Sequence, residues 1–357
     1  MKRYIREFGY YLLAGLMFWY CWVILTEPIE INDGIIASLQ RCLNVIIPSL
    51  FAVMVISSLL IRSSAYELLS KPFSLIAKYI FAMPKELFSV FVISNTAGYP
   101  VGAKLLRELY DKESITAESA EALLCCCYAP GPAFLSGTVG LAVYGSTRIG
   151  IIIFLSCLVS NCMIAAVICR IRKPHISKAA ASKWVSPDML IDSVLSCGRS
   201  LLEICLLIVF FSTVISVLEH YGIPGAAARI FGISGAESIF CSVAEISQIS
   251  ELENAPFAYI PALAAVCSFG GLCVVMQIIT VVKKRFSLRF FLLTRPIASL
   301  LSALNSIWLC RLMLPDELAA VSNSSKIFVK VNNFIPSVCL ILMIFLLKLK
   351  KGVAFSK

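Results

Sequence analysis

The chain has 357 residues, of which 59% are hydrophobic and only 15% are charged. A soluble domain needs far less apolar surface to build one core, so this composition excludes a soluble protein and indicates a polytopic membrane protein. The net charge of +10 would suit nucleic-acid binding. However, the basic residues gather between apolar segments and not on one face, so we assign them to membrane orientation and expect no nucleic-acid partner.

About 20 helical residues cross a hydrocarbon core of about 30 Å. We expect eight transmembrane helices, within windows 10–26, 41–61, 118–145, 148–170, 200–219, 258–282, 290–312 and 331–349. The first window follows Lys2, Arg3 and Arg6 as a signal peptide would. No small-residue cleavage site comes after it, so we expect a retained anchor helix.

The basic residues fall mostly on one side of the membrane if the N-terminus is cytoplasmic. Lys283-Lys-Arg285 and the lysines near the C-terminus then lie inside, whereas Asp33 and Glu219 lie outside. Cytoplasmic loops of membrane proteins carry an excess of Lys and Arg. The pattern therefore predicts a multi-pass protein with both termini in the cytoplasm.

A run of small, polar and helix-breaking residues, Ile93-Ser-Asn-Thr-Ala-Gly-Tyr-Pro-Val-Gly-Ala-Lys104, lies between two apolar segments. Gly98, Pro100 and Gly102 interrupt backbone pairing, and hydrocarbon cannot satisfy the backbone groups that are freed. Such backbone persists at membrane depth only if it is buried in protein or lines a wet cavity. Because both ends of this region are basic, we expect a re-entrant hairpin that turns back on the cytoplasmic side.

The next span contains a second broken stretch, Tyr128 to Thr138, which includes Pro130-Gly131-Pro132. The helix that leads into it should begin at Thr116, which is expected to act as N-cap with Glu118 and Ser119 in the first turn. We expect this unwound helix to face the first hairpin, as in a transporter site near the membrane midplane.

The second half repeats the order of the first. A span (200–219) is followed by a short amphipathic piece (223–231), a polar hairpin (236–253), a Gly-broken span (258–282) and a return span (290–312). Spans 41–61 and 200–219 run in opposite directions under the charge assignment, which predicts inverted repeats with a site between them. The expected units are an anchor (1–34), repeat 1 (35–172), a cytoplasmic linker (173–194), repeat 2 (195–315) and a C-terminal helix with a basic tail (316–357).

Glu245 stands in the otherwise apolar second hairpin, where a carboxylate at membrane depth costs roughly 2.5–3.5 kcal/mol. A bound solute, a coupling proton or cation, or Lys104 from the opposite hairpin would compensate for this cost. The alternative is that the segment lies at the outer surface with its acids solvated.

Span 258–282 contains Ser268-Phe-Gly-Gly271 and Gln277, the counterpart of the Pro-Gly-Pro break. This glycine pair indicates either an opened backbone or close helix packing. Asn161 and Asn305 occupy the two return spans, where each could cap opened backbone or join two helices.

We expect the substrate site to draw on both broken stretches of each half. Its candidate residues are Asn95, Thr96, Gly98, Tyr99, Gly102, Lys104, Pro130, Gly131, Pro132, Glu245, Gln248, Ser268, Gly270, Gly271 and Gln277. Cys125-Cys-Cys127 places three thiols on different helix faces, which favours core packing over metal binding. No nucleophile, base and orienting group appear together, so we expect neither an enzyme nor a cofactor.

At Asn95-Thr-Ala-Gly-Tyr-Pro-Val-Gly-Ala-Lys104, with Pro130-Gly-Pro-Ala-Phe134 and Ser268-Phe-Gly-Gly271…Gln277, the chain resembles the YlbJ-type sporulation integral membrane proteins. These belong with the nucleoside recognition, or Gate, domain proteins, which include concentrative nucleoside transporters. The resemblance covers roughly residues 35 to 315. The second hairpin departs from the family pattern, because Ile249 stands where a glycine is expected.

The resemblance implies a bacterial endospore former, a multi-pass protein of the cell membrane and a role in building the spore envelope. It also implies an all-α, concentrative-nucleoside-transporter-like fold. The paired broken hairpins and the lack of an ATP-binding signature lead us to expect a secondary carrier that moves a small polar solute by alternating access, with a proton or sodium ion as coupling partner. The alternative is a non-transporting component that binds sporulation partner proteins, or a second copy of itself, during cortex assembly.

Overall fold

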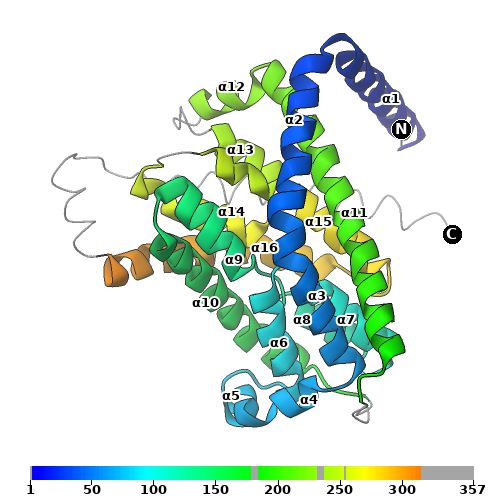
Figure 1. Ribbon diagram of the computed structural model, residues 1–357, viewed down its shortest axis with the longest axis vertical. Helices are drawn as coiled ribbons and strands as arrows, with labels where there is room; N and C mark the ends of the chain where they lie inside the picture. The colour runs from blue at the N-terminus through cyan, green and yellow to red at the C-terminus, as the bar shows by residue number, and fades with distance from the viewer. Residues whose placement is uncertain (1, 178–183, 231–236, 253–254, 315–357) are drawn as a thin grey trace.

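The computed structural model describes residues 2–177, 184–230, 237–252 and 255–314 (Figure 1). Within these ranges the chain forms helices joined by short turns, and the only β-type pairing is one isolated bridge between Ile115 and Ile176. In chain order the helices are α1 (Lys2–Thr26), α2 (Pro28–Arg41), η1 (Cys42–Ile46), α3 (Ile47–Arg62), α4 (Tyr66–Leu69), η2 (Lys71–Phe73), α5 (Ser74–Tyr79), α6 (Lys85–Ala97), α7 (Val101–Asp111), α8 (Ala117–Leu124), α9 (Pro132–Phe134), η3 (Leu135–Val143), α10 (Thr147–Arg172), α11 (Pro187–His220), α12 (Ile223–Ile230), α13 (Glu237–Ala244), η4 (Ile246–Glu251), η5 (Phe257–Tyr259), α14 (Ile260–Phe269), α15 (Gly271–Val282) and α16 (Arg289–Met313).

Six helical stretches in the described part of the chain are long and apolar enough to cross a membrane. They are Gly9–Thr26, Ile31–Arg62, Thr147–Arg172, Pro187–His220, Phe257–Val282 and Arg289–Met313. The predicted all-helical, multi-pass architecture is confirmed. The predicted window 331–349 lies outside the described residues.

The predicted span 118–145 does not form one continuous helix. Helix α8 ends at Leu124, and helical structure resumes only at Pro132 in α9 and η3. Pro130 and Pro132 each lack an amide donor and disfavour helical backbone at the residue before them. The segment Pro132–Val143 is therefore a short apolar helix and not one of the six long ones.

The region around Asp33, between the predicted windows 10–26 and 41–61, forms helix α2, which begins at Pro28 and continues through η1 into α3. The junction is π-helical: the amide of Ile47 donates to the carbonyl of Cys42, five residues earlier. Pro48 follows at once, and a π-turn accommodates a residue that cannot donate to the helix. The span is longer than its hydropathy window indicated because the polar residues around Asp33 fit the same helix.

The rod formed by α2, η1 and α3 packs antiparallel to α11 (Figure 1). At one end, Arg62 Nη1 lies 4.0 Å from Asp192 Oδ2. At the other end, Gly34 abuts Ser216 so closely that a Cβ on Gly34 would lie 2.0 Å from the Ser216 hydroxyl oxygen. The two long elements therefore run in opposite directions across the molecule.

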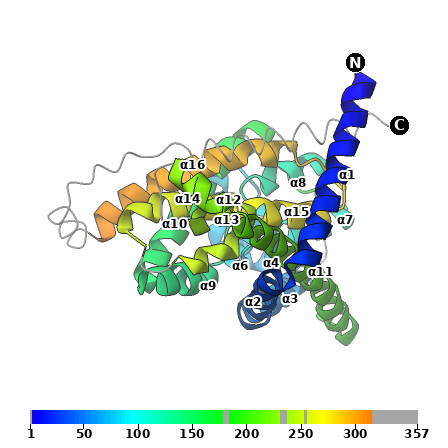
Figure 2. The same ribbon diagram turned by 90° about the horizontal axis from the view of Figure 1, so that it is seen from above.

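Helices α10 and α16 form a second antiparallel pair, with α14 packed against both. The Asn305 amide donates to the Ser160 hydroxyl at 3.0 Å, and the Arg172 guanidinium stacks 3.9 Å from the centre of the Phe290 ring. Figure 2 shows α1 at the rim of the molecule, away from this pair. Helix α1 touches the rest mainly through a small cluster of Val23, Ile31 and Val217.

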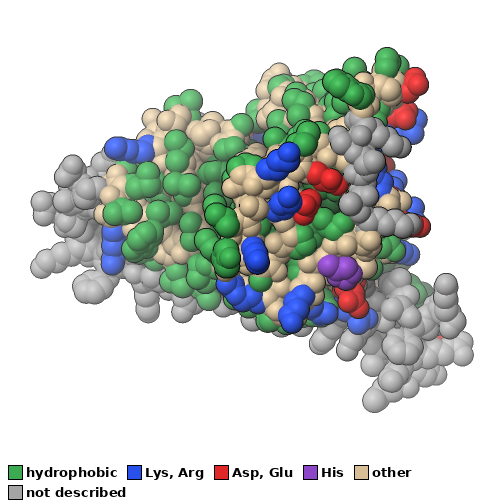
Figure 3. All heavy atoms as spheres, turned by 90° about the horizontal axis from the view of Figure 1, so that it is seen from below, with side chains coloured by type: hydrophobic (Ala, Val, Ile, Leu, Met, Phe, Trp, Pro, Cys, Tyr) green, Lys and Arg blue, Asp and Glu red, His purple; other side chains and the backbone are tan. Residues whose placement is uncertain are grey.

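One end of the molecule, which we call the basic side, gathers the ends of α3, α7, α10 and α15. The Lys112 ammonium donates to the carbonyl of Ile61 at 2.9 Å, and Arg285 Nε lies 3.2 Å from Asp111 Oδ1. Lys and Arg side chains are spread over this face among apolar ones (Figure 3). Thr116 begins α8 here and caps it as predicted, because its hydroxyl accepts from the Ser119 amide at 3.2 Å.

Candidate functional site

The two broken stretches of the first half meet backbone to backbone. Helices α6 and α7 form a hairpin whose turn contains Gly98 at φ +88°, a conformation open to glycine. A Cβ on Gly98 would lie 2.9 Å from the amide nitrogen of Gly131, and a Cβ on Gly102 would lie 2.1 Å from the carbonyl oxygen of Cys127. Glycine is required at both places because another backbone occupies the space of a side chain.

Two tyrosines connect the broken stretches of the first half to the glycine pair Gly270-Gly271, where the helix of the second half is interrupted. The Tyr99 hydroxyl donates to the carbonyl of Cys267 at 2.7 Å, and the Tyr128 hydroxyl donates to the carbonyl of Phe269 at 2.8 Å. Their rings pack together with centroids 4.8 Å apart. Gly270 adopts φ +84°, and a Cβ there would lie 2.0 Å from the Tyr128 hydroxyl oxygen. The glycine pair thus opens the backbone and does not serve simple helix packing.

Carbonyls left without partners at the end of α8 are satisfied by three buried side chains. Asn95 donates to the carbonyl of Cys126 at 3.1 Å, and Asn161 donates to the carbonyl of Tyr128 and to the Asn95 side-chain oxygen, both at 2.8 Å. Arg295 donates to the carbonyl of Cys125. Asn161 therefore caps opened backbone, whereas Asn305 joins α16 to α10.

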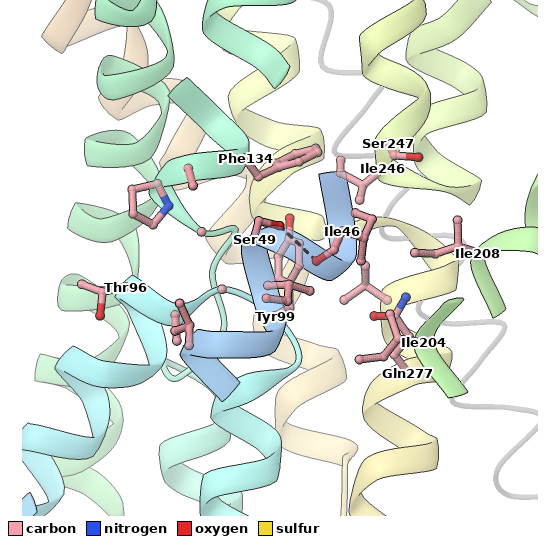
Figure 4. Close-up of a pocket in the computed structure, with 18 of the residues that line it drawn as sticks. Ile46, Ser49, Thr96, Tyr99, Phe134, Ile204, Ile208, Ile246, Ser247 and Gln277 are labelled. Atoms are coloured by element: carbon pink, nitrogen blue, oxygen red, sulfur yellow. Dashed lines mark hydrogen bonds between the residues drawn. The ribbon is translucent and has the colours of Figure 1, made fainter. Parts of the chain in front are cut away.

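A cavity of about 210 Å³ lies where the breaks of the two halves converge (Figure 4). Seven of the fifteen predicted residues line it: Thr96, Gly98, Tyr99, Gly131, Pro132, Glu245 and Gln277. Most of the remaining wall is apolar and comes from α3, α9 and α11. The site therefore draws on helices from both halves of the chain.

The other eight predicted residues do not line this cavity. They are Asn95, Gly102, Lys104, Pro130, Gln248, Ser268, Gly270 and Gly271. Asn95, Gly102 and Gly270 take part in the contacts described above, and a Cβ on Gly271 would lie 3.0 Å from the carbonyl oxygen of Ser242. Gln248 and Ser268 are buried. These positions support the shape of the site without reaching its interior.

Glu245 is 1% exposed and is the one charged residue that lines the cavity in the described part of the chain. Its carboxylate accepts from the Ser247 amide at 3.0 Å and from the Ser247 hydroxyl. The hairpin of α13 and η4 begins at the side opposite the basic one, where the Cys241 thiol donates to the Glu219 carboxylate at 3.4 Å. The view that the Glu245 carboxylate is solvated at an outer surface is wrong, because its side chain is buried in the lining of the cavity.

Lys104 does not pair with Glu245, contrary to one of our expectations. Its ammonium donates to the Cys197 thiol at 2.9 Å, on the side of the hairpin that faces α11. Nearby, burial raises the pKa of the Glu108 carboxyl, and the Lys104 ammonium and a hydrogen bond from Ser58 partly offset that rise. Lys104 thus belongs to the polar contacts beneath the cavity on the basic side.

Arg295, which holds the broken stretch without lining the cavity, is the main supporting residue that sequence reasoning missed. It is fully buried, and its guanidinium lies 4.8 Å from the centre of the Tyr128 ring. A signal was present, because a cation inside the predicted span 290–312 is costly unless it has partners. Those partners are carbonyls about 170 residues earlier in the chain. The sequence could therefore identify Arg295 as an unusual residue but could not predict its role.

No protein-family model, curated protein or solved structure matches this chain.

Proposed function

We propose that this protein is a secondary carrier that moves a small solute across a bacterial cell membrane by alternating access between two inverted repeats. The observation that carries the proposal is the cavity in which Thr96 to Tyr99 of one hairpin face Glu245 of the other. Hairpins that start from opposite sides and meet at a shared site are typical of secondary transporters. The resemblance to Gate-domain sporulation proteins agrees with this proposal.

Glu245 is the proposed coupling residue. A carboxylate in a cavity of apolar walls is costly when ionised and unpaired. Among the described residues it forms no ion pair within 4.0 Å, and Arg41, the cation whose charge acts on it, is paired with Glu251. A proton or a sodium ion that arrives with the solute would remove that cost, which links solute binding to cation movement.

Uptake into proteoliposomes under an imposed proton or sodium gradient tests the proposal. Glu245→Gln should reduce uptake by about tenfold or more, because the amide cannot neutralise a bound cation or release a proton. Glu237→Gln, on the same hairpin but outside the cavity, should transport like the native protein. Normal uptake by a folded Glu245→Gln variant would remove this residue from the mechanism.

The second candidate function is a non-transporting membrane component that binds partner proteins during spore-envelope assembly. It is favoured by the many predicted polar residues, such as Asn95 and Lys104, that bond within the bundle. Thermal unfolding measured with a panel of nucleosides, amino acids, metals and cell-wall precursors distinguishes the carrier from the non-transporting component. A true ligand at about 100 times its Kd should stabilise by roughly 2.7 kcal/mol, whereas a non-transporting component should respond to none.

Alternating access also requires that the two hairpins enter from opposite faces. Single cysteines at Glu118 and Arg229 suit this test because both side chains are exposed. The background should lack the exposed Cys21 and also Cys339, which lies outside the described residues. An impermeant thiol reagent should label position 229 in intact cells and position 118 only after the inner face is opened. Labelling of both from one side would contradict the inverted repeats.

A further inference from the structure

The exposed residues among the cavity lining indicate an opening sideways between helices and not toward either end of the molecule. Its exposed lining residues are Val53 on α3, Thr96 at the end of α6 and Ala133 on α9, which we call the mouth. The opposite wall, which includes Ile204 and Gln277, is buried. In Figure 4, Thr96 lies on one side of the cavity, and Ile204, Ile208 and Gln277 lie on the other.

The mouth lies deep within the apolar thickness of the protein. Val53 is nine residues from Arg62, and Thr96 is eleven residues from Lys85. At about 1.5 Å per helical residue these separations are roughly 14 and 17 Å. Half of a hydrocarbon core is about 15 Å. The mouth is therefore near the level of the bilayer midplane.

The polar groups close to the mouth are satisfied by their own helices. The Thr96 hydroxyl donates to the carbonyl of Val92 at 3.0 Å, and the Ser49 hydroxyl donates to the carbonyl of Ile46 at 3.2 Å. Hydroxyls that bond back to the preceding turn expose mainly carbon. The residues exposed around the mouth on α3, such as Ile56, are apolar. This surface suits lipid and not an aqueous vestibule.

The polar groups that can bind a solute lie in the buried part of the cavity lining. Gln277 and Glu245 are both buried, and Figure 4 shows Gln277 on the side away from Thr96. Leu50 and Phe134 add apolar lining. A volume of about 210 Å³ is below the roughly 300 Å³ at the low end for drug-sized ligands. The cavity therefore fits a small polar head, whereas a longer apolar tail would extend through the mouth.

We propose that the solute is an amphiphile dissolved in the bilayer, with a small head group that donates hydrogen bonds, and that it enters the cavity sideways through the mouth. This inference rests on the proposed carrier site and names its substrate class. Glu245 and Gln277 bind the head, and the tail stays among lipid chains. The solute reaches the site without crossing water.

A monoacylglycerol that carries a photoreactive diazirine at the head-group end of its chain, next to the ester, tests this in lipid nanodiscs. Crosslinks mapped by mass spectrometry should concentrate on residues that line the cavity. Excess unlabelled monoacylglycerol should compete, whereas excess glycerol should not. Val53→Trp should lower cavity crosslinking by about fivefold or more, because the indole fills the mouth. Ile56→Trp, one turn along the same exposed helix, should leave it unchanged.

Two outcomes would overturn the inference. One is equal competition by glycerol, which indicates an aqueous route to the site. The other is crosslinking that spreads over the outer surface and does not respond to Val53→Trp, which indicates a lipid annulus without a portal.

If crosslinking behaves as expected but no gradient drives uptake, the amphiphile site stands and the carrier mechanism fails. If a gradient drives uptake of a water-soluble solute only, without cavity crosslinks, the carrier mechanism stands and the amphiphile site fails.

Discussion

Alanine at Gly102 is expected to lower the free energy of unfolding by about 3 kcal/mol, the upper range for overpacking a tight interior. The added Cβ would lie 2.1 Å from the carbonyl oxygen of Cys127 and 3.0 Å from the Ser94 Cβ. The first contact is with backbone, which cannot rotate away as a flexible side chain can. The hairpin and the broken stretch would have to separate, and the carbonyls capped by Asn95 would lose their partners.

Gly198 provides the matched control for this substitution. It also lies inside a helix, α11, but a Cβ there would have no neighbour within 4 Å. Alanine in a helix interior is favoured over glycine by about 1 kcal/mol. Gly198→Ala should therefore leave the unfolding midpoint in detergent unchanged or raise it. If Gly102→Ala and Gly198→Ala gave the same midpoint, the close packing of α7 against the Cys127 backbone would be wrong.

Replacement of Arg295 by methionine is expected to destabilise the protein by up to about 3 kcal/mol. The guanidinium donates to the carbonyls of Cys125 and, at 3.5 Å, of Tyr128, and methionine can bond to neither. Each buried polar group left unpaired costs about 1–3 kcal/mol. Asn161 keeps the Tyr128 carbonyl paired, so the carbonyl of Cys125 is the one that is freed. Removal of a buried cation also recovers part of the cost of desolvating it, but the freed carbonyl remains where water does not reach.

Arg311→Met on the same helix is the control, because Arg311 is exposed. Its unfolding midpoint in detergent should stay close to that of the native protein. The unfolding midpoint of Arg295→Lys should fall between those of Arg295→Met and Arg311→Met. The lysine ammonium keeps the charge but lacks the planar guanidinium, whose nitrogens reach two carbonyls. Native-like stability of Arg295→Met would mean that the guanidinium does not hold the end of α8.

Some features of this protein follow from local sequence. Six of the eight apolar windows and the Thr116 cap depend on residues within one segment, so hydropathy and capping preferences identified them directly. The interruptions of helical backbone at Gly98, Pro130 and Gly270 were predicted for the same reason. Proline and glycine change the backbone at their own positions, whatever packs around them.

The partners of those breaks were decided by the tertiary structure. Tyr128 bonds to Phe269, and Arg295 to Cys125, across more than 140 residues. Hydropathy shows that a polar group inside a span needs a partner, but it does not show which helix face will bring one. Glu245 illustrates the limit: its bonds come from Ser247, two residues away, while the expected Lys104 turns toward α11. The choice depends on the rotation and depth of each packed helix, and these are set by contacts among all the helices at once.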